Sequence, residues 1–174
     1  YPKILEKKIK SIFFIIPENI EKKNYLTWNM ILEMSRNGIR FGSHSLSHQN
    51  MKRLEIKTLQ NEFIKSKDIL QQKLGKEIID FSYPYGQFNN RTNLYAIESG
   101  YKNIFSSNHG IYTSEQKIKP RNSINSSHSI VDINKILDAN IYQRIKWDIE
   151  DKLKPSFKNI LGENTYSKIR NFIA

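Results

Sequence analysis

The chain has 174 residues, with 28 Lys or Arg against 17 Asp or Glu, and a formal net charge of +11. This length predicts one domain, and a hydrophobic content of 38% is enough for a packed core and too much for a disordered chain. The absence of cysteine excludes a disulfide framework, a thiolate metal site and a cysteine nucleophile, and the longest apolar run, 11–17, is too short to span a membrane.

The positive charge by itself would fit a nucleic-acid-binding protein, because Lys and Arg release counterions from phosphates. However, the basic residues are mostly Lys, are spread along the chain, and accompany abundant Ile and Asn. This composition is typical of an A/T-rich genome. A basic nucleic-acid-binding domain is therefore the weaker alternative, and no nucleic acid is expected as a partner.

Short apolar runs alternate with amphipathic stretches, which predicts strands and helices around a parallel sheet. In the first half we expect a strand over 11–16, a helix capped by Thr27 and ended by Gly38, a strand over 39–44, a helix over 56–74 ended by Gly75, and a strand over 78–83. Such α/β chains carry their chemistry at the carboxyl ends of the strands.

The second half continues the alternation less clearly. We expect a helix over 91–99, weaker strands over 101–106 and 120–125, and a helix capped by Asp132 that runs to Ile141. The more charged residues after Trp147 predict a peripheral helical tail. The expected division is a domain over 1–146 and a tail over 147–174.

Two of the four histidines, His44 and His48, follow the predicted strand over 39–44. A spacing of four residues would place both imidazoles on one side of a helical turn, where they could bind one divalent ion. The alternative is a loop whose histidines only bond to the backbone. Two histidines are half of a metal site, so a further ligand is required.

A second motif, 81–86, also ends a predicted strand. Pro84 fixes one backbone angle and Gly86 permits a positive φ, so the chain can turn sharply and direct an N–H group into a pocket. Such a group could stabilise an oxyanion. The same residues are also an ordinary way to end a strand.

Together, the segments 41–48 and 81–86 resemble the second and third motifs of the polysaccharide deacetylase family, the NodB-homology or carbohydrate esterase family 4 domain. The resemblance covers about residues 1–140. Further segments agree in order: 11–16, 26–28, Gly38, 100–101 and 120–121.

The resemblance implies a distorted (β/α)7-type barrel, similar to a TIM barrel, that hydrolyses N-acetyl or O-acetyl groups of a cell-envelope or surface glycan. It implies one divalent metal ion, zinc first, with cobalt or nickel as alternatives. In the family two histidines, matching His44 and His48, and an aspartate hold the metal. The backbone N–H matching Tyr85 polarises the acyl oxygen, and a late histidine protonates the leaving amine.

The resemblance also places Tyr83, Pro84, Gly86 and Arg121 at the substrate side, although a surface ion pair would equally explain Arg121. His128 is the expected acid, against the alternative of an exposed loop residue, and His109 is less favoured for this role. Many relatives have an Arg at the position of Ser82.

The family's first motif, Thr-Phe-Asp-Asp-Gly, is absent, and no two Asp residues are adjacent in the chain. That motif normally precedes a segment like 1–5, so we expect the first strand, the base and the third metal ligand to lie upstream of Tyr1, along with any targeting signal. Asp80 is a much weaker candidate for the third ligand. The main alternative is an inactive, deacetylase-like carbohydrate-binding protein.

Overall fold

The structure, a computed structural model, describes residues 1–161. It divides into two compact units, of which the first comprises 1–106 and 117–119. The second comprises 107–116 and the residues from 120 onward. None of the helices in the described residues is long and apolar enough to cross a membrane.

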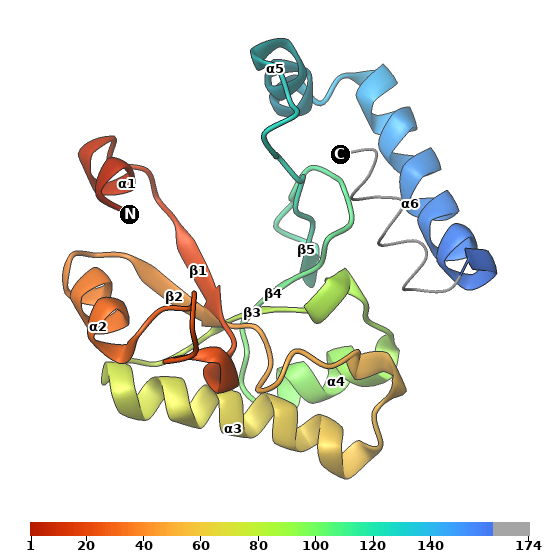
Figure 1. Cartoon of the computed structure of the whole chain (residues 1–174). Helices are drawn as coiled ribbons and strands as arrows, with labels where there is room; N and C mark the ends of the chain where they lie inside the picture. Colours follow the sequence, from red (N-terminus) through yellow and green to blue (C-terminus); the bar gives the residue numbers. More distant parts are fainter. Residues whose placement is uncertain (162–174) are drawn as a thin grey trace. The chain divides into compact units, whose positions relative to one another are not determined.

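The first unit contains a sheet of five parallel strands in the order of the chain (Figure 1). The strands are β1 (Ile12–Ile15), β2 (Arg40–Ser43), β3 (Asp80–Ser82), β4 (Asn103–Phe105) and β5 (Ile118–Lys119). Parallel neighbours need crossover connections, which for the first three pairs contain the helices α2 (Trp28–Arg36), α3 (Ile56–Leu74) and α4 (Asn90–Glu98). The connection from β4 to β5 contains no helix. This arrangement confirms the predicted α/β sheet.

Short elements complete this unit. They are the helix α1 (Pro2–Glu6) and the 3₁₀ turns η1 (Pro17–Asn19), η2 (Met51–Arg53) and η3 (Pro84–Gly86). The predicted helix boundaries are confirmed at two ends. The Thr27 hydroxyl accepts a bond from the Met30 N–H at the start of α2, and Gly75 ends α3 with a φ of 63°.

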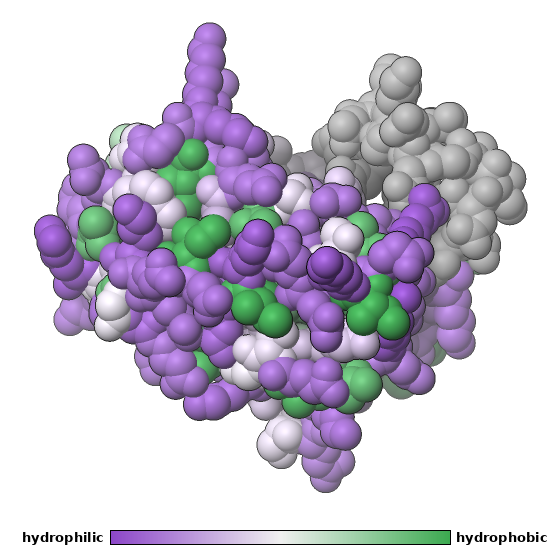
Figure 2. Space-filling view, turned by 90° about the horizontal axis from the view of Figure 1, so that it is seen from below, coloured by the Kyte–Doolittle hydropathy of each residue, from purple (hydrophilic) through white to green (hydrophobic). Residues whose placement is uncertain are grey.

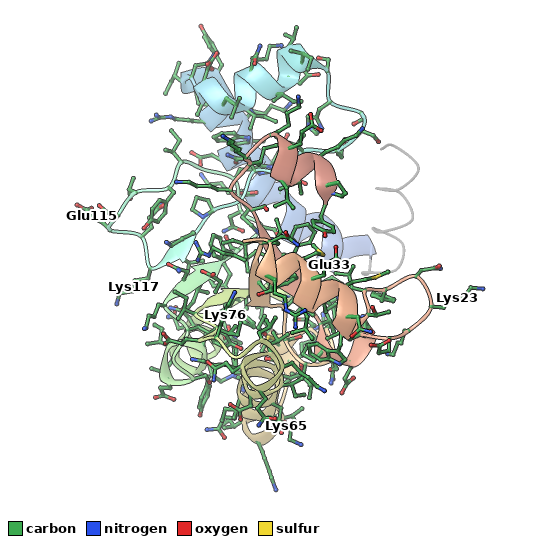
Figure 3. The ribbon with its side chains drawn as sticks, turned by 90° about the vertical axis from the view of Figure 1, so that its left-hand side faces the viewer. Lys23, Glu33, Lys65, Lys76, Glu115 and Lys117 are labelled. Atoms are coloured by element: carbon green, nitrogen blue, oxygen red, sulfur yellow. The ribbon has the colours of Figure 1, made fainter. Side chains whose placement is uncertain are left out.

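The core is built on one face of α3, which packs against α2, α4 and β2. Leu59, Phe63 and Leu70 on this face are fully buried, and the Phe63 ring lies 4.8 Å from that of Phe81 in β3. The opposite face is solvated: Lys65 points away from the sheet in Figure 3. Figure 2, seen from below, shows a mostly hydrophilic surface with scattered apolar residues. α3 is therefore amphipathic, as its sequence predicts.

The second unit contains α5 (Ile130–Asp138) and α6 (Ile141–Leu161). The prediction of Asp132 as the cap was wrong: Ser129 is the N-cap, and Asp132 closes a capping box three residues later. Ala139, in a left-handed conformation, ends α5, so Ile141 begins the next helix. The predicted boundary between residues 146 and 147 falls inside α6. Of the predicted tail over 147–174, residues 162–174 lie outside the described residues.

The predicted strand over 120–125 was also wrong. The strand at this point is β5, which pairs Ile118 with Ile104 and Lys119 with Phe105 of β4. Pro120 follows directly and has no N–H to donate, so the parallel ladder cannot continue through it.

Gly42 in β2 lies between the backbone of Asp80 in β3 and the side chain of Phe14 in β1. A Cβ atom at this residue would come within 2.8 Å of the Asp80 carbonyl oxygen and of the Phe14 ring. The Phe14 ring in turn contacts Phe105, with centroids 5.3 Å apart, and lies 6.5 Å from the His44 ring. Only glycine lets β1 and β3 approach β2 this closely.

We therefore expect Gly42→Ala to lower the free energy of unfolding by about 1–3 kcal/mol, because the backbone oxygen cannot move away cheaply. Urea unfolding measures this loss. Gly75→Asn is the control, since no atom lies within 4 Å of a Cβ there and Asn tolerates its left-handed backbone. An unfolding free energy of Gly42→Ala equal to that of the control would contradict the steric argument.

Candidate metal and active site

The two predicted histidines come together at the carboxyl end of β2. The centroids of the His44 and His48 rings lie 4.9 Å apart. The expectation of a helical turn was wrong, because Ser45 and His48 have left-handed φ angles of 65° and 64° and residues 44–50 form a loop. Non-glycine residues in this conformation are held there by other contacts, and they concentrate at functional sites.

A hydrogen bond fixes the tautomer of His44. Its Nδ1 lies 2.6 Å from the carbonyl oxygen of Ser82, at the end of β3. Since a carbonyl only accepts, Nδ1 must carry the proton, and a neutral ring then has its lone pair on Nε2. Histidines that bind metals are oriented in this way by an outer partner.

His48 lies between His44 and Tyr85, whose ring centroid is 4.7 Å from that of His48. Its backbone N–H donates to the Ser45 hydroxyl over 3.0 Å. Burial lowers the pKa of the His48 imidazole from its ordinary value of 6.5. The ring is therefore neutral at neutral pH, which is the form that can donate electrons to a metal.

The motif over 81–86 forms the sharp turn that its sequence predicts. Tyr85 has a φ of 57° and Gly86 a φ of 64°. The turn is closed by bonds from the Gly86 N–H to the Tyr83 carbonyl and from the Gln87 N–H to the Pro84 carbonyl. These bonds leave the Tyr85 N–H outside the closure of the turn.

The four predicted residues of this turn differ in exposure. Tyr83, Pro84 and Gly86 are buried, whereas 56% of Tyr85 is exposed. The Tyr83 ring stacks on Phe88 at 5.4 Å, and burial raises the pKa of its phenol. Three of the predicted substrate-binding residues thus build the turn, and Tyr85 is the one whose side chain faces solvent.

Neighbouring strand ends bring the two motifs together. Ser43 of β2 pairs with Phe81 of β3. The bond from His44 to Ser82 crosses between these strand ends, and a bond of 2.8 Å joins Asn50 to Gln87 farther along. The histidines and the Tyr85 turn therefore form one site.

Asp80 does not join this site. Its carboxylate accepts bonds from Arg40 over 2.6 Å and from Asn103 over 2.7 Å, so it links the strands β2, β3 and β4. Among the side chains that the structure describes, no group of three His, Cys, Asp or Glu is arranged to hold a metal ion. The described residues thus supply two imidazoles that could hold a metal ion.

A buried carboxylate on α3, Glu62, lies behind the histidine loop and was missed in the sequence. Only 2% of it is exposed, and it accepts bonds from the N–H groups of Leu46 and Ser47 and from the Ser47 hydroxyl. One sequence signal could have identified it: Glu62 lies on the buried face of α3, between Leu59 and Phe63. A charged residue there requires a partner.

The other predicted residues, Arg121, His128 and His109, lie in the second unit. His128 caps its own turn, with Nδ1 3.0 Å from the Asn125 side-chain oxygen. Arg121 bonds to the Ser107 hydroxyl, and burial lowers the pKa of its guanidinium. A cavity of about 670 Å³ in this unit is lined by both His128 and His109.

His109 has the more constrained environment of the two histidines. The Asp151 carboxylate accepts from its backbone N–H over 2.8 Å and lies 2.9 Å from its Nδ1. The ring stacks on Trp147, with an interplanar angle of 5°. Asp151 therefore fixes the His109 tautomer in the way that Ser82 fixes that of His44.

Comparisons with known proteins agree with the resemblance found in the sequence. The family model for polysaccharide deacetylases matches residues 1–104. The protein YxkH of Bacillus subtilis is 29% identical over 102 residues, which are 59% of this chain and 37% of YxkH. A peptidoglycan-N-acetylglucosamine deacetylase of Bacillus cereus is 31% identical over 90 residues, 49% of this chain and 31% of that protein. The chain thus spans about a third of these relatives.

Solved structures show the same fold. The deacetylase PplD of Streptococcus pyogenes, in complex with acetate, has a TM-score of 0.73 at 24% identity, over 78% of this chain and 62% of PplD. A mutant of a CE4 family pseudoenzyme has a TM-score of 0.51 at 22% identity, over 59% of this chain and 38% of that one. The fold is thus that of the CE4 deacetylases, a distorted (β/α)7 barrel, as predicted.

The lowered pKa of His48 gives a testable pH dependence in metal-free protein. The unfolded chain takes up the proton near the ordinary pKa of 6.5, whereas folded His48 takes it up at a lower pH. His48 therefore contributes stability that is present above pH 6.5 and is lost as the pH falls through its folded pKa. His48→Gln should flatten the stability profile between about pH 7 and 5.

Nuclear magnetic resonance titration with a chelator present measures the His48 ring directly. His48→Gln identifies its signal, and His128→Gln is the control that removes a different ring. A His48 titration midpoint at or above 6.5 would contradict the expected effect of burial.

Proposed function

Because this chain belongs to the polysaccharide deacetylase family, we propose that it hydrolyses N-acetyl or O-acetyl groups of a cell-envelope or surface glycan at the His44 and His48 site. In this reaction water adds its oxygen to the acyl carbon, the bond from that carbon to nitrogen or oxygen breaks, and acetate and a free amine or hydroxyl leave. The observation that carries the proposal is the convergence of both imidazoles beside the Tyr85 turn.

The two imidazoles fit a divalent metal ion. His44 presents Nε2 because its Nδ1 is engaged by Ser82, and burial favours the neutral form of His48. Imidazole nitrogens suit zinc, cobalt and nickel. A bound ion would supply Lewis acidity toward the acyl oxygen and toward water.

The turn over 83–86 would serve the acyl oxygen. The Tyr85 N–H lies outside the bonds that close the turn, at a residue whose backbone is left-handed. A fixed N–H donor stabilises the negative charge that develops on the acyl oxygen. The exposed Tyr85 ring beside His48 offers an apolar face to a sugar ring.

The leaving amine requires a proton, and two histidines of the second unit are candidates for the general acid. His128 is the residue that the sequence favours. His109 is the better oriented candidate, because the Asp151 carboxylate accepts from its backbone N–H and lies 2.9 Å from its Nδ1.

An inactive, carbohydrate-binding relative is the second candidate function. Two observations favour it: the chain has no adjacent Asp pair that could supply the base and a third ligand, and one protein of the same fold is a CE4 family pseudoenzyme. Such a protein would bind an acetylated glycan through the Tyr85 surface without turnover.

Acetate release from an acetylated amino-sugar oligomer tests the first function. With added Zn²⁺ or Co²⁺ we expect acetate release that a chelator abolishes. His44→Ala and His48→Ala should each reduce the rate by at least about 100-fold, because the loss of an outer partner alone costs about 10–100-fold. Lys65→Ala, on the solvated face of α3, is the matched control and should retain the rate.

The result that would overturn the enzymatic proposal is glycan binding with no acetate release at any metal concentration. That result would instead support the carbohydrate-binding protein. Acetate release that is unaffected by both histidine variants would show that hydrolysis occurs at another site.

Substitution of the two late histidines decides which one is the acid. We expect His109→Gln to lower kcat by about 10²–10⁴-fold for an N-acetyl substrate, the usual contribution of general acid catalysis. His128→Gln should have a much smaller effect. The reverse order of effects would restore His128 to this role.

A further inference from the structure

We propose that Glu62 is a positioning residue for the two-histidine site: its buried carboxylate holds the loop between His44 and His48 in the shape that brings the two rings together. An effect of Glu62 on catalysis rests on the proposed function, whereas its effect on the positions of the two rings does not. Glu62 lies on α3, outside both sequence motifs.

The bonds to Glu62 come from consecutive residues of the loop. Oε2 accepts from the N–H groups of Leu46 and Ser47 over 2.8 and 3.0 Å. Oε1 accepts from the Ser47 hydroxyl over 2.5 Å, and the Gln49 side-chain nitrogen lies 3.3 Å from the same oxygen. All of these partners are donors, and a carboxylate is the side chain that only accepts.

Because Glu62 is buried, its carboxylate requires the hydrogen-bond donors of the loop. A carboxylate that is 2% exposed is costly unless it is fully hydrogen-bonded, so the loop and the carboxylate depend on each other. The amide of a glutamine has the same shape but replaces one acceptor oxygen by an NH₂ group. That group would face the donors of the loop, so the isosteric change removes bonds without leaving a cavity.

The loop transmits this constraint to the rings through a strained backbone. Ser45 and His48 are left-handed, on either side of the two N–H groups that Glu62 holds. The His48 N–H then donates to the buried Ser45 hydroxyl. Without Glu62 the loop would relax toward ordinary φ values, and the His48 ring would move away from the His44 ring.

The test compares wild-type protein with Glu62→Gln and Ser47→Ala. Ser66→Ala is the matched control, because Ser66 is also buried on α3 but bonds to Ser43, Phe63 and Tyr101 in the core. The readout without metal is the ¹⁵N spectrum of the His44 and His48 rings and of the Leu46 and Ser47 amides. We expect Glu62→Gln to shift the Leu46 and Ser47 amide signals and the His48 ring signals, and Ser66→Ala to leave them in place.

The second readout is Co²⁺ affinity, measured by titration. Loss of an outer-shell partner weakens metal binding by about 10–100-fold, and we expect a loss in this range for Glu62→Gln. Ser47→Ala removes one donor and leaves the buried carboxylate in place. Its loss should be smaller, and the double variant should be no worse than Glu62→Gln alone.

Each outcome decides the role of Glu62. Wild-type spectra and affinity in a folded Glu62→Gln protein would overturn the proposal. If Glu62→Gln does not fold, Ser47→Ala provides the test, and unchanged His48 signals in that variant would overturn the proposal. If the wild-type chain binds no metal, the proposed function is contradicted, while the ring spectra still decide whether Glu62 positions the histidines.

Discussion

The parallel pairing of β2 with β3 is the constraint on which the site depends. It places Ser43 beside Phe81, so the residues that follow each strand emerge at the same edge of the sheet. His44 and Tyr85 are 41 residues apart in the chain, yet the ring of His48 contacts the rings of both. The close pairing in turn requires glycine at position 42, where a side chain would overlap both neighbouring strands.

Three hydrogen-bond partners set the orientation of the site from outside it. Ser82 fixes the proton of His44, Glu62 holds the loop between the histidines, and Ser45 anchors the His48 backbone. The left-handed residues at 45, 48 and 85 are the conformations that these bonds must maintain. The site is thus held in shape by hydrogen bonds within the chain.

The chain belongs to the deacetylase family, yet its sequence contains no adjacent Asp pair. The fold, the histidine pair and the strained turn agree with a hydrolase, whereas the carboxylates of Asp80 and Glu62 bind other groups: Asp80 links the strands and Glu62 holds the loop. Neither carboxylate can act as a base without breaking the contacts that hold the site. A base for the proposed hydrolysis would therefore have to come from residues other than these two.

Local patterns in the sequence determined the order of strands and helices, the Thr27 and Gly75 caps, the histidine pair and the turn at Pro84, because each of these depends on residues close together in the chain. The tertiary structure decided the non-helical shape of the histidine loop and the tautomer of His44, since both depend on bonds to residues far away in the sequence. It also decided the roles of the acidic residues. The sequence offered Asp80 as a weak candidate for the third ligand and did not point to Glu62, and only the positions of Arg40, Asn103 and the loop N–H groups show what each carboxylate binds.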